Sequence, residues 1–259
     1  MSEYLLFEIR DNVARITFNR PASRNALTFA MYERLEKACG EIAADRSVRA
    51  VILSGAGDKA FAAGTDISEF RAFKTAEDAL AYESRIGRVL GGIEKLGVPV
   101  IAAINGACTG GGAGIAAACD MRLGTPTLKY GFPVARTLGN CLSMDNYARL
   151  SALIGAARLK EIIFTARFIG ADEARAIGLL NEVLPDGAAL MARAEELATL
   201  MAGHAPLTLR ATKEALRRLV SKAAQDEDKD LIISCYTSRD FREGMEAFLN
   251  KRAPNWRGE

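Results

Sequence analysis

The chain has 259 residues, of which 49% are hydrophobic and 25% charged, and 34 basic against 32 acidic residues leave a net charge of +2. This balance is typical of a globular protein with a substantial core, and it excludes the strongly basic surface of a nucleic-acid-binding protein. Five scattered cysteines without a CxxC pair, and the single histidine His204 at a predicted helix end, argue against a disulfide framework, a zinc site or a catalytic scheme built on histidine.

The N-terminal residues 1–12 carry charges around a short apolar run, which is not the pattern of a signal peptide. The apolar runs of the chain fall short of the roughly 18 residues that a membrane-spanning helix needs. We therefore expect a cytoplasmic protein with no metal and with neither a membrane nor a nucleic acid as partner.

The first half of the chain alternates predicted strands with predicted helices. Alternating or β-branched runs predict strands at 4–10, 13–19, 48–57, 98–106 and within 121–132. Apolar residues at helical spacing predict helices at 29–45, 76–97 and 110–120. Asp11-Asn12 reads as a hairpin turn between the first two strands, and Thr28 or Ser23 as the cap of the first helix.

From about residue 141 the pattern becomes mostly helical. Strands alternating with helices, followed by helices alone, predict an α/β protein with a helical C-terminal region. Those last helices can pack on the chain's own core or on a neighbouring subunit, and the sequence leaves both arrangements open.

The stretch "GACTGGGAGI" (106–115) has five glycines, and three kinds of site could require them. A P-loop is excluded, because GxxxxGK followed by Ser or Thr does not occur. Dinucleotide binding has two weak matches, "GAGIAA" and "GAGDKA". The second follows a predicted strand but leads into another small-residue turn, where that fingerprint needs a helix.

The third reading combines this stretch with the turn "FAAGTD" (61–66), since each joins a predicted strand to a helix through small residues. Backbone N–H groups at helix N-termini lack partners and favour negative charge. Two such turns facing one point would form an oxyanion hole. The plainer alternative, that the glycines only allow close helix–strand packing, stays open here.

Four segments carry a family resemblance: "NRPASRNAL" (19–27), "VRAVILSGAGDKAFAAGTDISEF" (48–70), "VPVIAAINGACTGGGAGIAAACDMRL" (98–123) and "EGMEAFLNKRAPNW" (243–256). In their order and spacing the chain resembles the crotonase (enoyl-CoA hydratase/isomerase) superfamily from residue 4 to its end. The resemblance implies a crotonase (ClpP-like) fold, with a ββα spiral core over residues 1–200 and a helical trimerisation region over 201–259.

The resemblance also implies an acyl-CoA substrate, with coenzyme A entering as part of that substrate and no separate cofactor. The oxyanion-hole amides would be those of Thr65 and Gly111. Family members commonly assemble as homotrimers or as hexamers made of two trimers. The residues expected to bind the substrate are Arg24, Ala26, Ala63, Asp66, Ile67, Gly110, Val134 and Arg136; Asp66 reads equally well as a helix cap.

The two glutamates that hold water in hydratases of the family are absent. The first position falls on Gly114 and the second, after a Gly-x-Pro, on Val134. Cys141 matches the position of a carboxylate nucleophile in the family's aroyl-CoA dehalogenase, and a helix N-terminus there would lower the pKa of its thiol. Asp145 lies one turn further on. Plainer readings stay open: Cys141 as a small core residue and Asp145 as a solvated one.

We therefore expect an enzyme of the enoyl-CoA hydratase/isomerase type, a lyase or an isomerase, that stabilises a thioester enolate. The missing glutamates keep two alternatives open: another crotonase reaction (isomerisation, thioester hydrolysis or decarboxylation), or acyl-CoA binding without catalysis. An NAD-dependent oxidoreductase is a further alternative, which rests on "GAGDKA" alone.

Overall fold

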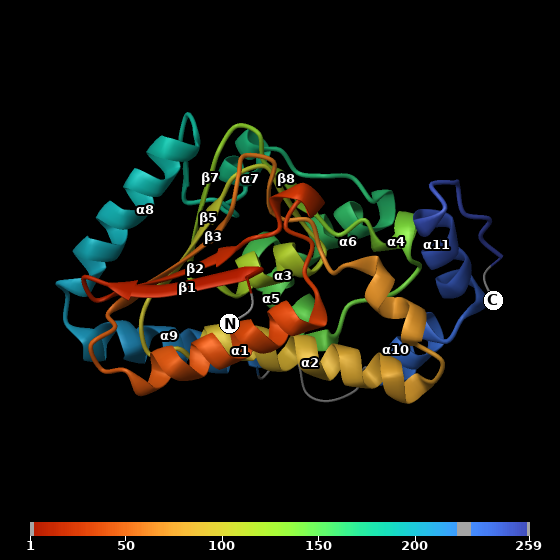
Figure 1. Cartoon of the computed structure of the whole chain (residues 1–259), viewed down its shortest axis with the longest axis horizontal. Helices are drawn as coiled ribbons and strands as arrows, with labels where there is room; N and C mark the ends of the chain where they lie inside the picture. The colour runs from red at the N-terminus through yellow and green to blue at the C-terminus, as the bar shows by residue number, and fades with distance from the viewer. Residues whose placement is uncertain (1–2, 222–228, 258–259) are drawn as a thin grey trace.

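The computed structural model describes residues 3–221 and 229–257, and within them the strands form two sheets, parallel except for one hairpin (Figure 1). The larger sheet has the order β1-β2-β3-β5-β7-β9 and the smaller one β4-β6-β8. The strands of the larger sheet are β1 (Leu5–Arg10), β2 (Val13–Phe18), β3 (Ala50–Gly55), β5 (Val100–Ile104), β7 (Met121–Gly124) and β9 (Glu182–Val183). Those of the smaller sheet are β4 (Ala60–Ala62), β6 (Ala107–Thr109) and β8 (Lys129–Gly131).

Successive segments repeat one order: a strand in the larger sheet, a strand in the smaller sheet, then a helix. β3 and β4 precede the 3-10 helix η2 (Ile67–Ala72) and α2 (Ala76–Lys95). β5 and β6 precede α3 (Gly111–Ala118), and β7 and β8 precede α4 (Val134–Thr137). This ββα repetition confirms the predicted α/β class and the spiral core.

The N-terminal hairpin follows the expected turn chemistry. Asp11 and Asn12 have φ angles of 52° and 61°, the left-handed conformation that a two-residue hairpin turn requires and that Asn and Asp tolerate. After the short 3-10 helix η1 (Pro21–Ser23), α1 (Phe29–Ala44) is capped by Thr28, whose hydroxyl accepts a hydrogen bond from the Met31 amide at 3.3 Å.

The central strands are buried on both faces, which explains their continuous apolar sequence. Along β3, Val51 and Leu53 face the core shared with α1, α2 and α3. Ala50 and Ile52 face the opposite core, which α8 (Gly187–Ala202) covers (Figure 1). The apolar strands of the larger sheet thus have helices packed on both faces.

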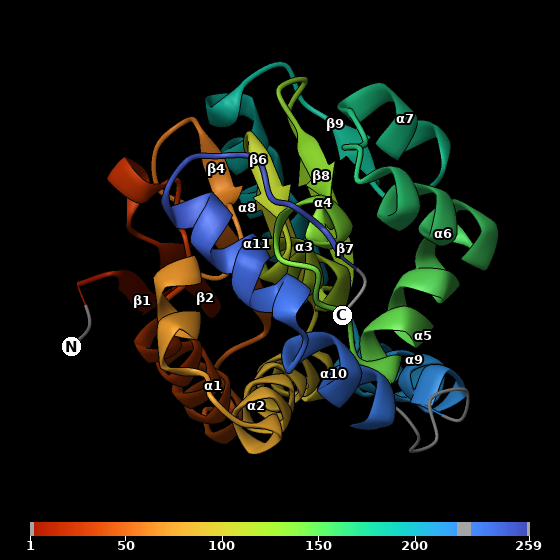
Figure 2. The same ribbon diagram turned by 90° about the vertical axis from the view of Figure 1, so that its right-hand side faces the viewer.

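The C-terminal helices pack on the chain's own core. α10 (Lys229–Tyr236) lies on α2, and α11 (Arg239–Leu249) lies on η2 and α4 (Figure 2). The ring of Phe241 stands 5.8 Å from that of Phe70, centroid to centroid. The other helices of this half are α5 (Met144–Ile154), α6 (Ala156–Thr165), α7 (Ala171–Ala176) and α9 (Pro206–Ser221). A trimerisation role for 201–259 stays a prediction.

The glycines of α3 differ sharply in the space around them, and this generates a stability prediction. A side chain at Gly112 would strike the Ala62 carbonyl and stand 2.7 Å from the Ala62 Cβ, whereas one at Gly114 would meet its nearest neighbour, Leu90, at 3.5 Å. Gly112→Ala is therefore expected to lower the free energy of unfolding by about 1–3 kcal/mol through overpacking.

The matched variant Gly114→Ala fills ordinary space in the same helix, and it is expected to raise the free energy of unfolding by about 0.4–1 kcal/mol by restricting the unfolded chain. Urea unfolding of both variants measures the difference. Equal stabilities would show that β4 and α3 do not pack as closely as described.

Candidate active site

The smaller sheet brings three turns together at its carboxyl edge. β4, β6 and β8 are parallel neighbours, with Ala60 opposite Ala107 and Cys108 opposite Tyr130. Chain segments that leave parallel strands emerge at the same edge. Thr65 therefore lies beside Gly111, and Val134 follows on the next turn. All three line one cavity of about 670 Å³.

The first two turns touch through bare backbone. Gly64 has φ of +98° and Gly110 of +52°, and a Cβ at Gly64 would stand 3.3 Å from the Thr109 carbonyl oxygen and 3.8 Å from the Gly110 Cα. A residue other than glycine at either position would be conformationally strained, and at 64 it would also crowd the facing turn. Glycine is needed here to let the two turns approach.

The amides of Thr65 and Gly111 have no acceptor among the described residues, and neither have those of Gly64, Gly112 and Ala113 beside them. Gly111 is also the first residue of α3, where the helix dipole adds positive potential. Thr65 and Gly111 both line the cavity.

Two buried tyrosines hold the Thr65 turn in place, a feature that the sequence analysis missed. The Thr65 hydroxyl lies 2.8 Å from the hydroxyls of both Tyr32 of α1 and Tyr82 of α2. Burial raises the pKa of both phenols well above the usual value, so they stay neutral. The Tyr32 hydroxyl also occupies the space that a side chain at Gly111 would need.

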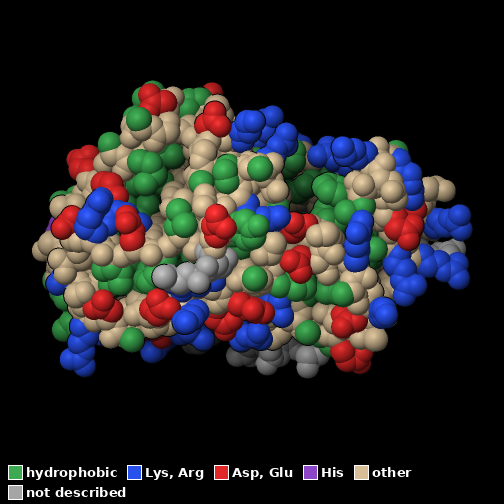
Figure 3. All heavy atoms as spheres, in the orientation of Figure 1, with side chains coloured by type: hydrophobic (Ala, Val, Ile, Leu, Met, Phe, Trp, Pro, Cys, Tyr) green, Lys and Arg blue, Asp and Glu red, His purple; other side chains and the backbone are tan. Residues whose placement is uncertain are grey.

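Every substrate-binding residue expected from the family resemblance lines this cavity: Arg24, Ala26, Ala63, Asp66, Ile67, Gly110, Val134 and Arg136. Exposed basic side chains also line it, among them Lys129, and Lys and Arg side chains gather beside a hollow with hydrophobic groups at its base in Figure 3. Asp66 caps η2 and pairs with Arg20 at 3.1 Å. Its partial burial opposes ionisation, but hydrogen bonds from Ser68 and Arg20 lower its pKa below the usual value.

The two positions without glutamate face the same cavity. A Cβ at Gly114 would point toward Leu90 at 3.5 Å and the Asn146 side-chain oxygen at 3.8 Å, and Val134 is buried at the start of α4. Asn146 accepts a hydrogen bond from Arg149 at 2.8 Å. Neither position supplies a group that could take or give a proton.

The sequence analysis did not identify Glu83, whose carboxyl group the structure places in this cavity. Glu83 belongs to α2 and is 8% exposed, and its Oε1 accepts a hydrogen bond of 2.5 Å from the Tyr236 hydroxyl of α10. A signal was available: the residue shares a helix face with Ala79, Ile86 and Leu90, which are otherwise apolar core positions.

Cys141 does not have the surroundings that we expected. It lies before Ser143, the N-cap of α5, so the helix N-terminus does not activate it. The Cys141 thiol donates a hydrogen bond to Cys235, and this bond together with burial raises the pKa of Cys141 far above that of a free thiol. It is also not among the described residues that line the cavity. The helix N-terminus expected to activate this thiol is therefore absent from its surroundings, and a catalytic role for Cys141 stays a prediction.

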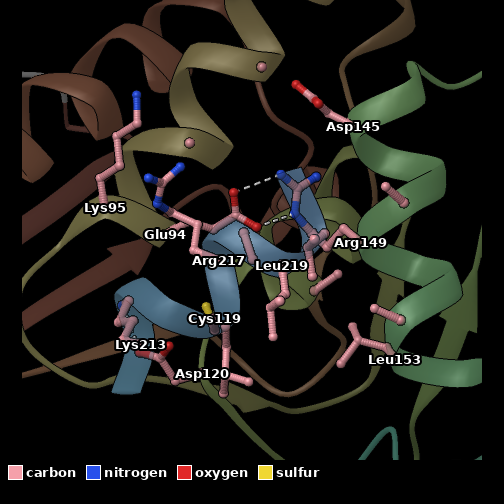
Figure 4. Close-up of a pocket in the computed structure, with 18 of the residues that line it drawn as sticks. Glu94, Lys95, Cys119, Asp120, Asp145, Arg149, Leu153, Lys213, Arg217 and Leu219 are labelled. Atoms are coloured by element: carbon pink, nitrogen blue, oxygen red, sulfur yellow. Dashed lines mark hydrogen bonds and ion pairs between the residues drawn. The ribbon is translucent and has the colours of Figure 1, made fainter. Parts of the chain in front are cut away.

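Asp145 is exposed and lines a different cavity, of about 520 Å³, between α2, α5 and α9. Figure 4 shows this cavity, with Glu94 and Arg149 facing one another across it while Asp145 stands apart on α5. The Arg149 Nε lies 2.6 Å from the Glu94 carboxylate. Asp145 is thus separated from the acceptor-free amides, and the structure brings no support for a catalytic role.

The "GAGDKA" segment does not form a dinucleotide site. It leads from β3 into β4, where the fingerprint needs a helix, and Asn25 donates to the carbonyls of Ala56 at 3.0 Å and Ala60 at 2.7 Å across this turn. Among the described residues, no three His, Cys, Asp or Glu side chains are grouped to hold a metal ion. Across the same residues, no helix has both the length and the apolar surface to cross a membrane.

Comparison with known proteins places the chain among acyl-CoA enzymes. The sequence model of the family "Enoyl-CoA hydratase/isomerase" matches residues 8–259. A short-chain-enoyl-CoA hydratase of Clostridium acetobutylicum is 37% identical, over 96% of this chain and 95% of that protein. A crotonyl-CoA hydratase of Syntrophomonas wolfei is 33% identical over 98% of both.

Solved structures agree in fold. A methylmalonyl-CoA decarboxylase in complex with 2-nitronate-propionyl-CoA superposes with a TM-score of 0.91 at 29% identity, over the full length of both chains. An enoyl-CoA hydratase/carnithine racemase of Magnetospirillum magneticum gives 0.81 at 36% identity, over 100% of this chain and 97% of that one. Relatives with one fold thus carry names of different reactions.

The thiol pair generates a prediction of its own. Iodoacetamide near neutral pH is expected to alkylate Cys235 before Cys141, because the hydrogen bond from Cys141 lowers the pKa of Cys235 to about 7 and raises that of its partner. Peptide mass spectrometry over time gives the order. Burial raises the pKa of the other thiols, which serve as controls expected to stay unmodified in the folded protein: Cys39, Cys108 and Cys119. Faster modification of Cys141 would reverse the donor and acceptor assigned here.

Proposed function

The chain belongs to the enoyl-CoA hydratase/isomerase family of the crotonase superfamily, and from that premise we propose that it binds an acyl-CoA thioester between the amides of Thr65 and Gly111. The observation that carries this proposal is the pair of amides without an acceptor on two abutting glycine turns, at the cavity of about 670 Å³ that the expected substrate-binding residues also line.

The chemistry follows from where negative charge develops. When a base removes a proton from the carbon next to a thioester, the electron pair moves to the carbonyl oxygen. Two preorganised N–H donors stabilise that oxygen more strongly than they stabilise the neutral carbonyl, and each is worth about 3–4 kcal/mol in known oxyanion holes. The hydrogen bonds that join the hydroxyls of Tyr32 and Tyr82 to that of Thr65 keep one donor fixed, so little reorganisation is needed at the moment of reaction.

The rest of the cavity suits the two ends of coenzyme A. Exposed Arg24 and Arg136, together with Lys129, offer positive charge to its phosphates. Ala26, Ala63 and Ile67 offer an apolar surface along which a pantetheine chain can lie. Coenzyme A then belongs to the substrate, and no further cofactor is required.

A reaction other than hydration is the second candidate, because positions 114 and 134 are a glycine and a valine. Addition of water across a double bond needs groups that hold and activate the water, and neither position has one. The similarity to a methylmalonyl-CoA decarboxylase shows that this fold also occurs with a different reaction. Binding without turnover remains an alternative that the experiment below separates. Assembly as a homotrimer or hexamer and a cytoplasmic location complete the proposal.

The role of the Gly111 amide can be tested with paired variants in a Tyr32→Phe background, which removes the oxygen that a new side chain would strike. Proline is tolerated at the first position of a helix and has no N–H. Gly111→Pro is therefore expected to lower kcat by about 10²–10³-fold relative to Gly111→Ala, which keeps the amide. Turnover is measured on a panel of enoyl-CoA thioesters.

Calorimetric titration with a saturated acyl-CoA checks that both variants still bind. Equal turnover by the proline and alanine variants would contradict the oxyanion-hole role of this amide. Tight acyl-CoA binding by the wild type, with no turnover of any thioester in the panel, would favour the non-catalytic alternative.

A further inference from the structure

The cavity that Thr65 and Gly111 line, here called the acyl cavity, is also lined by an acidic residue of α2. The two positions without glutamate lie in other helices, α3 and α4. Of the described residues that line the cavity, the acidic ones are Asp66 and Glu83. Asp66 is engaged by Arg20 and Ser68 as the cap of η2. Glu83 is buried on α2, on the wall that faces the smaller sheet's carboxyl edge.

Helix α2 relates Glu83 to the amide pair. Its neighbour Tyr82 touches the Thr65 hydroxyl at 2.8 Å, while Leu90, two turns further along, is the nearest neighbour of a side chain at Gly114. Glu83 and Leu90 are seven residues apart and so share one face of the helix. Along α2, Glu83 thus lies between the residue that contacts the oxyanion turn and the residue nearest to a side chain at Gly114.

A chain of two hydrogen bonds holds this carboxyl group. The Tyr236 hydroxyl of α10 donates to Glu83 at 2.5 Å, and the Asn140 side chain donates to the Tyr236 hydroxyl at 3.0 Å. Burial, then the nearby Glu83 charge, raises the pKa of Tyr236 well above its usual value, so the phenol remains a donor. A carboxyl group held in this way can exchange a proton without moving its side chain.

We propose that Glu83 is the general base of this site and that it moves a proton along the acyl chain of an unsaturated thioester without adding water; this rests on the proposed acyl-CoA function. The carboxylate takes a proton from the α-carbon of a 3-enoyl thioester. The C–H electron pair forms a C1–C2 double bond while the carbonyl π electron pair moves to the oxygen. The product is a dienolate, and the Thr65 and Gly111 amides stabilise its oxygen.

The second half of the step returns the same proton. The electron pair on the oxygen forms the carbonyl bond again, and the C1–C2 π pair moves to form the C2–C3 double bond. The C3–C4 π pair takes the proton of the Glu83 carboxylic acid at C4. Glu83 ends as a carboxylate, so atoms and electrons balance and neither water nor a redox partner is consumed. One carboxyl group suffices for this transfer, whereas hydration calls for groups that position a water molecule.

The experiment measures two rates with the full chain: deuterium exchange at the α-carbon of butyryl-CoA in D₂O, and isomerisation of 3-pentenoyl-CoA followed by absorbance of the conjugated product. Glu83→Gln is expected to lower kcat for both by about 10²–10⁴-fold with KM little changed, because it removes a proton acceptor but keeps the side chain's shape. Glu83→Asp, which restores a carboxylate, is expected to recover part of the rate.

The matched control is Glu77→Gln, an exposed carboxylate on the same helix, which is expected to leave both rates unchanged. Tyr236 acts as a positioning residue: Tyr236→Phe is expected to lower kcat while KM stays constant, and this variant also serves if Glu83→Gln does not fold. Wild-type rates in Glu83→Gln, or in both Glu83→Asp and Tyr236→Phe, would overturn the proposal.

The outcomes separate this inference from the proposed function. A wild-type protein that binds butyryl-CoA and hydrates crotonyl-CoA but shows no α-exchange and no isomerisation would overturn the role of Glu83 and leave an acyl-CoA enzyme. A protein that binds no acyl-CoA would overturn the proposed function itself.

Discussion

The parallel pairing of β4, β6 and β8 is the constraint on which the site depends. Each strand has only three residues, so each contributes little by itself, yet their common direction places the turns after β4 and β6 side by side. The smaller sheet packs into the core that the larger sheet shares with α1, α2 and α3, through Phe61, Cys108 and Tyr130. Glycines 64 and 110 then let the turns touch, and Thr65 and Gly111 line the cavity beside them.

Long periodic segments could be predicted from the sequence, and short ones could not. β1, β2, β3, β5, α1 and α2 lie within the predicted ranges, because each has enough residues to show its period. β4 fell inside a predicted loop, and β6 and β9, of three and two residues, were missed since no period shows over so few positions. The expected activation of Cys141 depended on a similarly short distance along the chain: α5 begins at Met144, so its N-terminus does not reach the thiol.

In the site, too, features of a short stretch of sequence could be predicted, whereas contacts between distant residues could not. Glycine turns are visible in a sequence, whereas the family resemblance assigned the two amides to Thr65 and Gly111 and the positions without carboxylates to Gly114 and Val134. Glu83 could not be assigned, because its partner Tyr236 is 153 residues away and meets it only where α10 packs on α2. The cavity that Gly114 and Val134 line without a carboxylate is thus also lined by Glu83, from a different helix.

The measurement that tests the account most directly is a crystal structure with a saturated acyl-CoA bound. The account predicts the thioester oxygen about 2.7–3.1 Å from the amide nitrogens of both Thr65 and Gly111, the range of established oxyanion holes. It also predicts the α-carbon beside the Glu83 carboxyl group. A thioester oxygen directed away from these two amides would contradict the central claim.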